Sequence, residues 1–176
     1  MAAALPQGLL RLELDFAGCG LGGRGLRAVA GALPRGLTHL CLGLGACGLT
    51  DAGAEALAAG MPPRLRELSL DLAESGITGR GAAALFGALP SCLKDLDAGL
   101  RACRLGLQGA LAVSSGLPAC LRRLSLDFTA CGIEHQGALA VHAGIARLEG
   151  LLSQNVVYDA YGGDVIVTDP PDSEEE

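Results

Sequence analysis

The sequence predicts an α/β solenoid, a fold in which one short strand and one short helix alternate along a stack of similar units. Two observations predict it. The chain repeats itself five times without a gap between Leu5 and Gly144, with a period of 28 residues. Proline occupies the second position of every unit, at Pro6, Pro34, Pro62, Pro90 and Pro118. A period between about 20 and 50 residues is typical of solenoids, whose units bury their apolar sides only against their neighbours.

We therefore expect one repeat domain, residues 1–144, with units 5–32, 33–60, 61–88, 89–116 and 117–144. In each unit apolar residues alternate from the eighth position to the twelfth, as at Leu40, Leu42 and Leu44, which indicates a strand with one buried face. The second half of each unit is rich in alanine and predicts a short helix, as at 50–59, where Thr50 is placed to cap it.

The apolar pattern of the unit, L-x-x-L-x-L-x-L/F-x-x-C-x-L/I, resembles the leucine-rich repeat family and specifically its ribonuclease-inhibitor-like branch. It departs from the family in having four residues, not two, between Leu14 and Cys19 and at the matching places of other units. We interpret these residues as one more pleat of strand, with a further buried row at Phe16, Leu44, Leu72, Leu100 and Phe128. The resemblance implies a right-handed horseshoe, with a parallel sheet on the concave face and helices on the convex face.

Composition excludes several classes of protein. Aromatic residues make up only 3% of the chain, and tryptophan is absent, which favours a repetitive aliphatic core over a globular enzyme. No stretch reaches the roughly 18 apolar residues of a membrane span, and no signal peptide is expected. Residues 1–144 hold 12 basic and 11 acidic residues and residues 145–176 hold one and eight, so the chain has no excess of basic charge that would hold nucleic acid.

The seven cysteines predict a structural role and not a metal or disulfide site. Four of them share the turn position of the units, which the family fills with Asn or Cys: Cys19, Cys47, Cys103 and Cys131. Their number is odd, and no pair has the C-x-x-C spacing of a zinc knuckle. We therefore expect no cofactor, free thiols, and a reducing, cytoplasmic location.

Outside the repeats, we expect residues 145–169 to cap the last unit, with a hairpin around Gly162 and Gly163, and residues 170–176 to form a disordered acidic tail. The first unit begins almost at Met1, which leaves its leucine-lined end without a polar cap. This predicts that a neighbouring subunit, a second copy or an upstream region covers that end.

The family commonly binds through the exposed strand face, which forms the concave floor. Carboxylates occupy its outward positions and form the predicted contact with a basic partner protein: Glu13, Asp15, Asp71, Asp97 and Asp127. Basic residues and one histidine border them and are expected to form a rim: Arg11, His39, Arg66, Lys94, Arg122 and Arg123. The carboxylates at the eleventh position alternate with glycine, which places them too far apart to share one metal ion.

The sequence thus predicts a non-catalytic protein-interaction module or scaffold subunit. No nucleophile, base and acid fall together in a recognisable motif. Two alternatives remain open. The first is a GTPase activator of the nuclear-transport type, a family that shares such repeats and an acidic end; the second is an inhibitor of a basic enzyme such as a ribonuclease.

Overall fold

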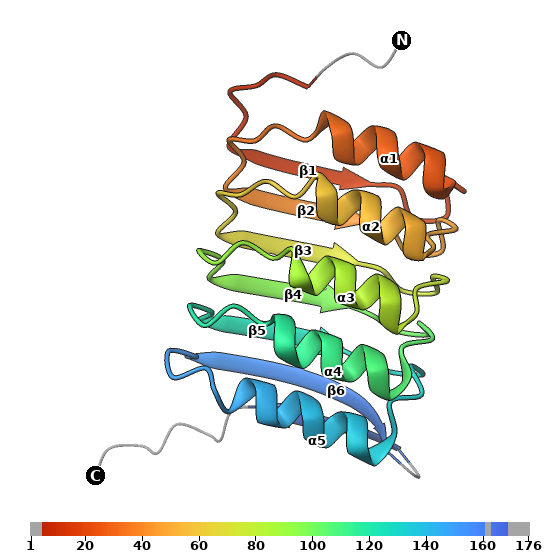
Figure 1. Cartoon of the computed structure of the whole chain (residues 1–176), viewed down its shortest axis with the longest axis vertical. Helices are drawn as coiled ribbons and strands as arrows, with labels where there is room; N and C mark the ends of the chain where they lie inside the picture. The colour runs from red at the N-terminus through yellow and green to blue at the C-terminus, as the bar shows by residue number, and fades with distance from the viewer. Residues whose placement is uncertain (1–4, 161–162, 169–176) are drawn as a thin grey trace.

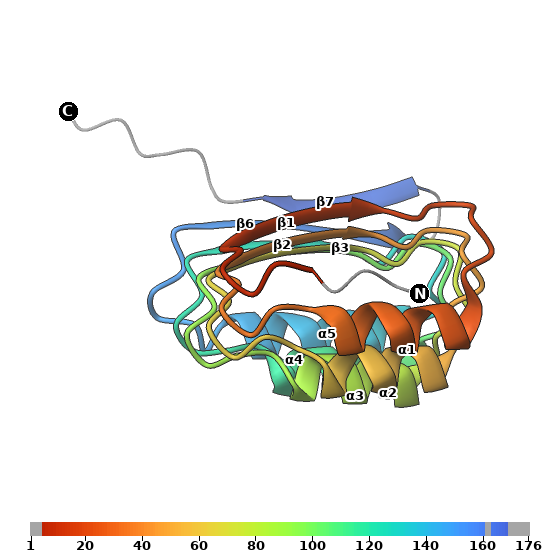
Figure 2. The same cartoon turned by 90° about the horizontal axis from the view of Figure 1, so that it is seen from above.

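The computed structural model describes residues 5–160 and 163–168. Seven strands form a single sheet in chain order, and the helices pack in one layer against one face of it (Figure 1 and Figure 2). The strands are β1 (Arg11–Asp15), β2 (His39–Gly43), β3 (Glu67–Asp71), β4 (Asp95–Gly99), β5 (Arg123–Asp127), β6 (Ser153–Ala160) and β7 (Gly163–Thr168). The helices are α1 (Gly22–Ala32), α2 (Asp51–Ala59), α3 (Gly79–Gly87), α4 (Gly106–Gly116) and α5 (Glu134–Ile145). The predicted α/β solenoid with a parallel sheet is confirmed.

The repeat length sets the register of the sheet. From β1 to β5 each strand pairs in parallel with the residue 28 positions later, so Leu12 lies beside Leu40 and Leu40 beside Leu68. Equivalent residues therefore form straight rows across the sheet, and each row has one kind of environment. The period ends at β6, where Ser125 pairs with Asn155.

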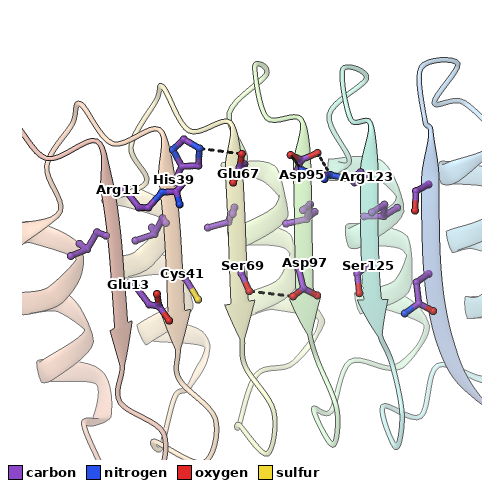
Figure 3. A pocket seen from close by; sticks show the side chains of 17 residues that line it. Arg11, Glu13, His39, Cys41, Glu67, Ser69, Asp95, Asp97, Arg123 and Ser125 are labelled. Atoms are coloured by element: carbon purple, nitrogen blue, oxygen red, sulfur yellow. Dashed lines mark hydrogen bonds and ion pairs between the residues drawn. The ribbon is translucent and has the colours of Figure 1, made fainter.

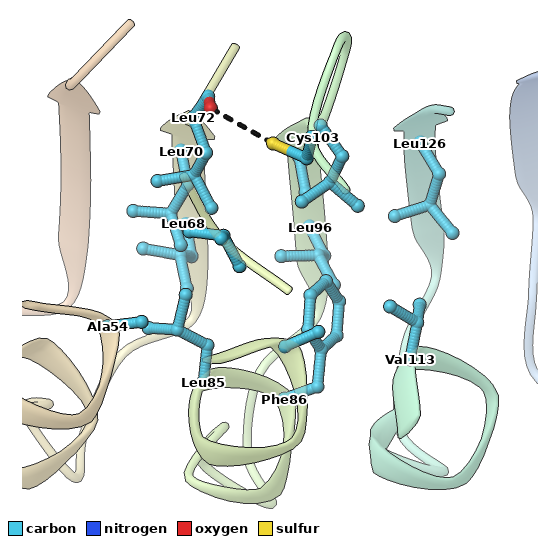
Figure 4. Close-up of a cluster of buried hydrophobic side chains, with 14 of the residues drawn as sticks. Ala54, Leu68, Leu70, Leu72, Leu85, Phe86, Leu96, Cys103, Val113 and Leu126 are labelled. Atoms are coloured by element: carbon cyan, nitrogen blue, oxygen red, sulfur yellow. Dashed lines mark hydrogen bonds between the residues drawn. The ribbon is translucent and has the colours of Figure 1, made fainter. Parts of the chain in front are cut away.

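Leucines from the strands and apolar residues from the helices fill the space between the two layers. In the middle of the stack Leu68, Leu70 and Leu96 of the strands share one buried cluster with Leu85 and Phe86 of α3 (Figure 4). Four members of the predicted row at the twelfth position are fully buried, with Leu44, Leu72, Leu100 and Phe128 at 0% exposure, whereas Phe16 in the first repeat is only half-buried. The row follows the strands and does not extend them, because every strand of the repeats ends at the eleventh position.

In the fourth and fifth repeats the turn after the strand is closed by a cysteine side chain, in line with the predicted structural role. The thiol of Cys103 donates to the carbonyl of Leu72 at 3.3 Å, and the thiol of Cys131 donates to the carbonyl of Leu100 at 2.8 Å. Both bonds cross to the preceding repeat. Burial raises the pKa of the Cys103 thiol, so the thiol remains protonated and keeps its donor.

The residues predicted to form a terminal hairpin form β6 and β7, which pair antiparallel, and β6 continues the parallel sheet beside β5. On the core side, the ring of Tyr158 from β6 stacks on Phe128, with ring centroids 5.7 Å apart. Burial raises the pKa of Tyr158 to about 12. The acidic segment 170–176 lies outside the described residues.

The first strand is less covered than the strands that follow it. Among the strands of the described residues, β1 pairs with β2 only. Leu12 and Leu14 are half-buried, whereas Leu40 and Leu42 in the same rows are 2% and 1% exposed. Leu10, just before β1, is 61% exposed.

A carboxylate from one repeat caps the helix of the next. Asp51, in the first turn of α2, accepts hydrogen bonds from the backbone of Thr78 at 2.8 Å and of Gly81 at 3.0 Å, and from the Thr78 hydroxyl at 2.7 Å. Burial alone would raise the pKa of Asp51, but these bonds and the nearby Arg80 lower it below its ordinary 3.8. Thr50 itself, the residue predicted as a cap, makes no side-chain capping bond.

We expect Leu68→Ala to lower the free energy of unfolding by about 2–5 kcal/mol, because it leaves a cavity in the middle of the core. Urea denaturation measures this loss. Leu139→Ala is the matched control: Leu139 is 54% exposed on α5, so its removal should cost no more than about 0.5 kcal/mol. Similar losses for the two variants would contradict the register described above.

We expect Asp51→Asn to lower the free energy of unfolding by about 1–3 kcal/mol near neutral pH, because the network loses a charged acceptor. Since the folded pKa of Asp51 is lowered, its carboxylate stabilises the fold above about pH 4, and this contribution is lost as the pH falls through the folded pKa. Denaturation of both proteins from about pH 7 to about pH 2 should therefore show the difference shrinking at acid pH. A difference that is constant over this range would rule out the charged cap.

Candidate binding face on the exposed side of the sheet

The exposed face of the sheet contains a groove of about 470 Å³ that crosses β1 to β6. Two rows of side chains give it its polar character, one from the seventh position of the repeats and one from the ninth (Figure 3). The seventh-position row is Arg11, His39, Glu67, Asp95 and Arg123. The ninth-position row is Glu13, Cys41, Ser69, Asp97 and Ser125. Ser153 and Asn155 of β6 continue the two rows.

Charges in the seventh-position row pair across neighbouring strands. His39 Nε2 lies 3.1 Å from Glu67 Oε1, and Thr38 Oγ1 lies 2.8 Å from His39 Nδ1. Arg123 donates two hydrogen bonds to Asp95, from Nε to Oδ1 at 2.9 Å and from Nη2 to Oδ2 at 2.6 Å. This bidentate pairing raises the pKa of Arg123. The parallel register produces both pairs, because it sets each seventh residue beside the next.

The structure divides the predicted basic rim into two sets. Arg11, His39 and Arg123 belong to the strands and share their row with two acids that sequence reasoning missed, Glu67 and Asp95. The remaining three precede their strands and lie outside the groove lining: Arg66, Lys94 and Arg122. The signal was present in the sequence, since Glu67 and Asp95 occupy the same position of the repeat as Arg11.

The ninth-position row forms the floor of the groove. Two of the predicted acids, Glu13 and Asp97, lie here, separated by the small side chains of Cys41 and Ser69. Ser69 donates from its hydroxyl to Asp97 Oδ2 at 3.2 Å. Arg11, Glu13 and Asp97 have no ion pair among the described residues, so their charges are open to a partner.

The other three predicted acids lie at the ends of their strands and serve the turns. Asp15 accepts from the backbone of Ala17 at 2.9 Å, Asp71 from that of Ala73 at 3.0 Å, and Asp127 from that of Thr129 at 2.9 Å. None of the three lines the groove.

The alternation of aspartate with glycine at the eleventh position has a local cause. A Cβ at Gly43 would collide with Asp15 Oδ1, and a Cβ at Gly99 would lie 3.3 Å from Asp71 Oδ1. Glycine in the next repeat therefore leaves space for the carboxylates of Asp15 and Asp71, whereas Asp127 lies beside Val157 of β6.

Comparison with known proteins agrees with the repeat architecture. A sequence profile described as Leucine Rich repeat matches residues 12–30, which span most of β1 and α1. Residues 12–30 thus carry a leucine-rich repeat, and the other four units repeat its apolar pattern. Among solved structures the chain is similar to the leucine-rich repeat-containing protein LegL7 from Legionella pneumophila, at 14% sequence identity and a TM-score of 0.35. The match covers 92% of this chain and 59% of that protein, and at this TM-score it adds nothing to the fold argument. The search of curated proteins gave no match.

Membership of the ribonuclease-inhibitor-like branch stays a prediction. In the described part of this chain, no three residues among His, Cys, Asp and Glu are grouped so that they could hold a metal ion. Within the same residues, no helix combines the length and the apolar character needed to cross a membrane.

We expect Asp71→Ala and Asp97→Ala to separate the two roles of the acids. Asp71→Ala should lower the free energy of unfolding by about 0.5–1.5 kcal/mol, because the backbone of Ala73 loses its acceptor. Asp97→Ala removes a carboxylate from the exposed floor and should cost no more than about 0.5 kcal/mol. Urea denaturation compares the two, and equal losses would contradict the division between turn and groove.

Proposed function

We propose that this chain is a non-catalytic interaction module that binds a partner protein through the groove defined above. Leucine-rich repeat proteins in general bind proteins and are not enzymes. The observation that carries the proposal is the pair of charged and polar rows held in register by one continuous sheet. Side chains on such a sheet are positioned before a partner arrives, which lowers the entropic cost of binding.

The charges of the groove favour a partner with basic groups. Its lining contains four carboxylates and only two guanidinium groups. The carboxylates are those of Glu13, Glu67, Asp95 and Asp97, and the guanidinium groups are those of Arg11 and Arg123. Asp15, Asp71 and Asp127 add negative charge at the strand ends, and we keep them in the proposed contact region although each also caps a turn. Complementary charge of this kind sets specificity and association rate more than it sets affinity.

The groove is too small to account for tight binding by itself. The six strands of the groove, about 4.8 Å apart and with about 17 Å of each exposed, present on the order of 400 Å² in projection. A stable interface buries about 800 Å² on each partner. We therefore include Arg66, Lys94 and Arg122 beside the groove, and the half-covered first strand, as further contacts in an assembly or homo-oligomer.

Free thiols support a reducing, cytoplasmic location. Cys103 and Cys131 each use the thiol proton to hold a turn to the preceding repeat, so the fold employs these residues in their reduced form. Inhibition of a basic enzyme such as a ribonuclease would be one form of binding through the acidic groove.

The test is affinity capture from the native source with the full chain and with the double variant Glu13→Gln/Asp97→Asn. We expect each lost charge to weaken a captured partner about tenfold, which corresponds to about 1.4 kcal/mol. Glu149→Gln is the matched control, because it removes one exposed acid outside the groove lining.

A second arm changes Asp15, Asp71 and Asp127 to serine and measures how far the strand ends contribute. If the same partner binds all of these variants as tightly as the original chain, the groove proposal is wrong and binding lies on the helices or the ends of the stack.

A further inference from the structure

We propose that Cys92 and Cys120 form a redox-modifiable thiol pair, which small disulfides convert into an intramolecular disulfide between the fourth and fifth repeats. The pair occupies the fourth position of these two repeats, in the loops that precede β4 and β5. Both cysteines are exposed. The proposal is independent of the partner that the groove binds.

The thiol of Cys120 lies directly over the backbone of Cys92. Its Sγ is 2.6 Å from the carbonyl oxygen of Ser91 and 3.0 Å from that of Leu93, the two residues that flank Cys92. Cys92 is oriented in the same way toward the repeat before it, with Sγ 3.5 Å from the carbonyl oxygen of Pro63 and 3.3 Å from that of Leu65. The two loops are therefore stacked, and the Cys120 thiol points at the backbone of Cys92, whereas the Cys92 thiol points at the third repeat.

The repeat spacing suits a disulfide. Parallel strands lie about 4.8 Å apart. Cysteines joined by a disulfide have Cα atoms about 4.4–6.8 Å apart. Only the Cys92 side chain has to change direction, from the carbonyl groups of the third repeat toward Cys120. Because it is exposed, a rotation about its Cα–Cβ bond meets little resistance.

The other cysteines in matching positions of neighbouring repeats differ from this pair. Cys47, Cys103 and Cys131 are buried, so the pairs Cys19 with Cys47 and Cys103 with Cys131 each contain at least one protected thiol. The fourth position also has no general need for cysteine, since the first three repeats place Gly8, Gly36 and Arg64 there. The turn position, by contrast, holds cysteine or serine in every repeat.

The chemistry proceeds by two thiol–disulfide exchanges. The thiolate of one cysteine attacks a sulfur of the small disulfide, forms a mixed disulfide and releases one small thiolate. The thiolate of the other cysteine then attacks the protein sulfur of the mixed disulfide, forms the Cys92–Cys120 bond and releases the second small thiolate. The two protein protons end on the released thiols, the protein is oxidised by two electrons, and the small disulfide is reduced by two.

The link joins loops that sit beside the proposed binding groove. Lys94 and Arg122 lie two residues after Cys92 and Cys120, immediately before β4 and β5. Oxidation removes the thiol protons that hold the two loops to the carbonyl groups of the preceding repeats and replaces those bonds with one covalent bond.

The experiment treats the folded full chain with oxidised glutathione, blocks remaining thiols and digests it with trypsin without reduction. Cleavage after Arg80, Lys94, Arg104 and Arg122 isolates Cys92 in peptide 81–94 and Cys120 in peptide 105–122. We expect these two peptides to appear as one linked species that separates on reduction and that carries neither glutathione nor the thiol-blocking group on Cys92 and Cys120. Cys19→Ser is the matched control, since it removes an exposed cysteine of the first repeat and should leave the linked species unchanged.

Cys92→Ser and Cys120→Ser should each abolish the linked species and leave the remaining cysteine as a mixed disulfide with glutathione. Retention of both glutathione adducts in the original chain, with no linked species, would overturn the proposal. Linkage of Cys92 or Cys120 to any other cysteine would overturn it as well.

Discussion

The in-register parallel ladder is the constraint on which the rest of this molecule depends. Five repeats of equal length stack so that every strand residue lies beside its equivalent 28 positions away. An apolar side chain therefore packs beside the side chain at the same position of the next repeat. Such a continuous buried row is formed by Leu40, Leu68, Leu96 and Leu124. No repeat has a core of its own, and stability comes from the contacts between neighbours.

Because of the same register, polar side chains of one repeat form hydrogen bonds with groups of the neighbouring repeat. Asp51 caps α3 from α2, the Cys131 thiol holds its turn to the repeat before it, and Arg123 reaches Asp95 on the adjacent strand. Each bond joins elements that are far apart in the chain yet neighbours in the stack. A polar residue in a repeat is thus best understood together with the same position one repeat earlier and one repeat later.

Much of the fold followed from periodicity, because the 28-residue period and the alternation of apolar residues are physical signatures of stacked strand–helix units. The candidate site followed only in part. Sequence reasoning placed Glu13 and Asp97 on the exposed face, and the structure lines the groove with both. It interpreted Arg11, His39 and Arg123 as members of a basic rim, whereas the structure sets them among Glu67 and Asp95 in a row of mixed charge. The predicted rim joined residues of the sixth position of the repeat with residues of the seventh. Only the seventh position belongs to the strand.

By itself, then, the sequence determined the number of repeats, the element order, the buried rows and the turn cysteines, because each of these is a property of one position repeated along the chain. Only the tertiary structure decided what the polar side chains do. Asp71 bends back to its own turn, whereas Asp97 stays on the open floor, two outcomes that composition does not distinguish. Likewise, two cysteines 28 residues apart become neighbours only when the loops stack. The physical reason is that a hydrogen bond or an ion pair depends on direction and distance at a single place, whereas hydrophobic burial depends on the pattern alone.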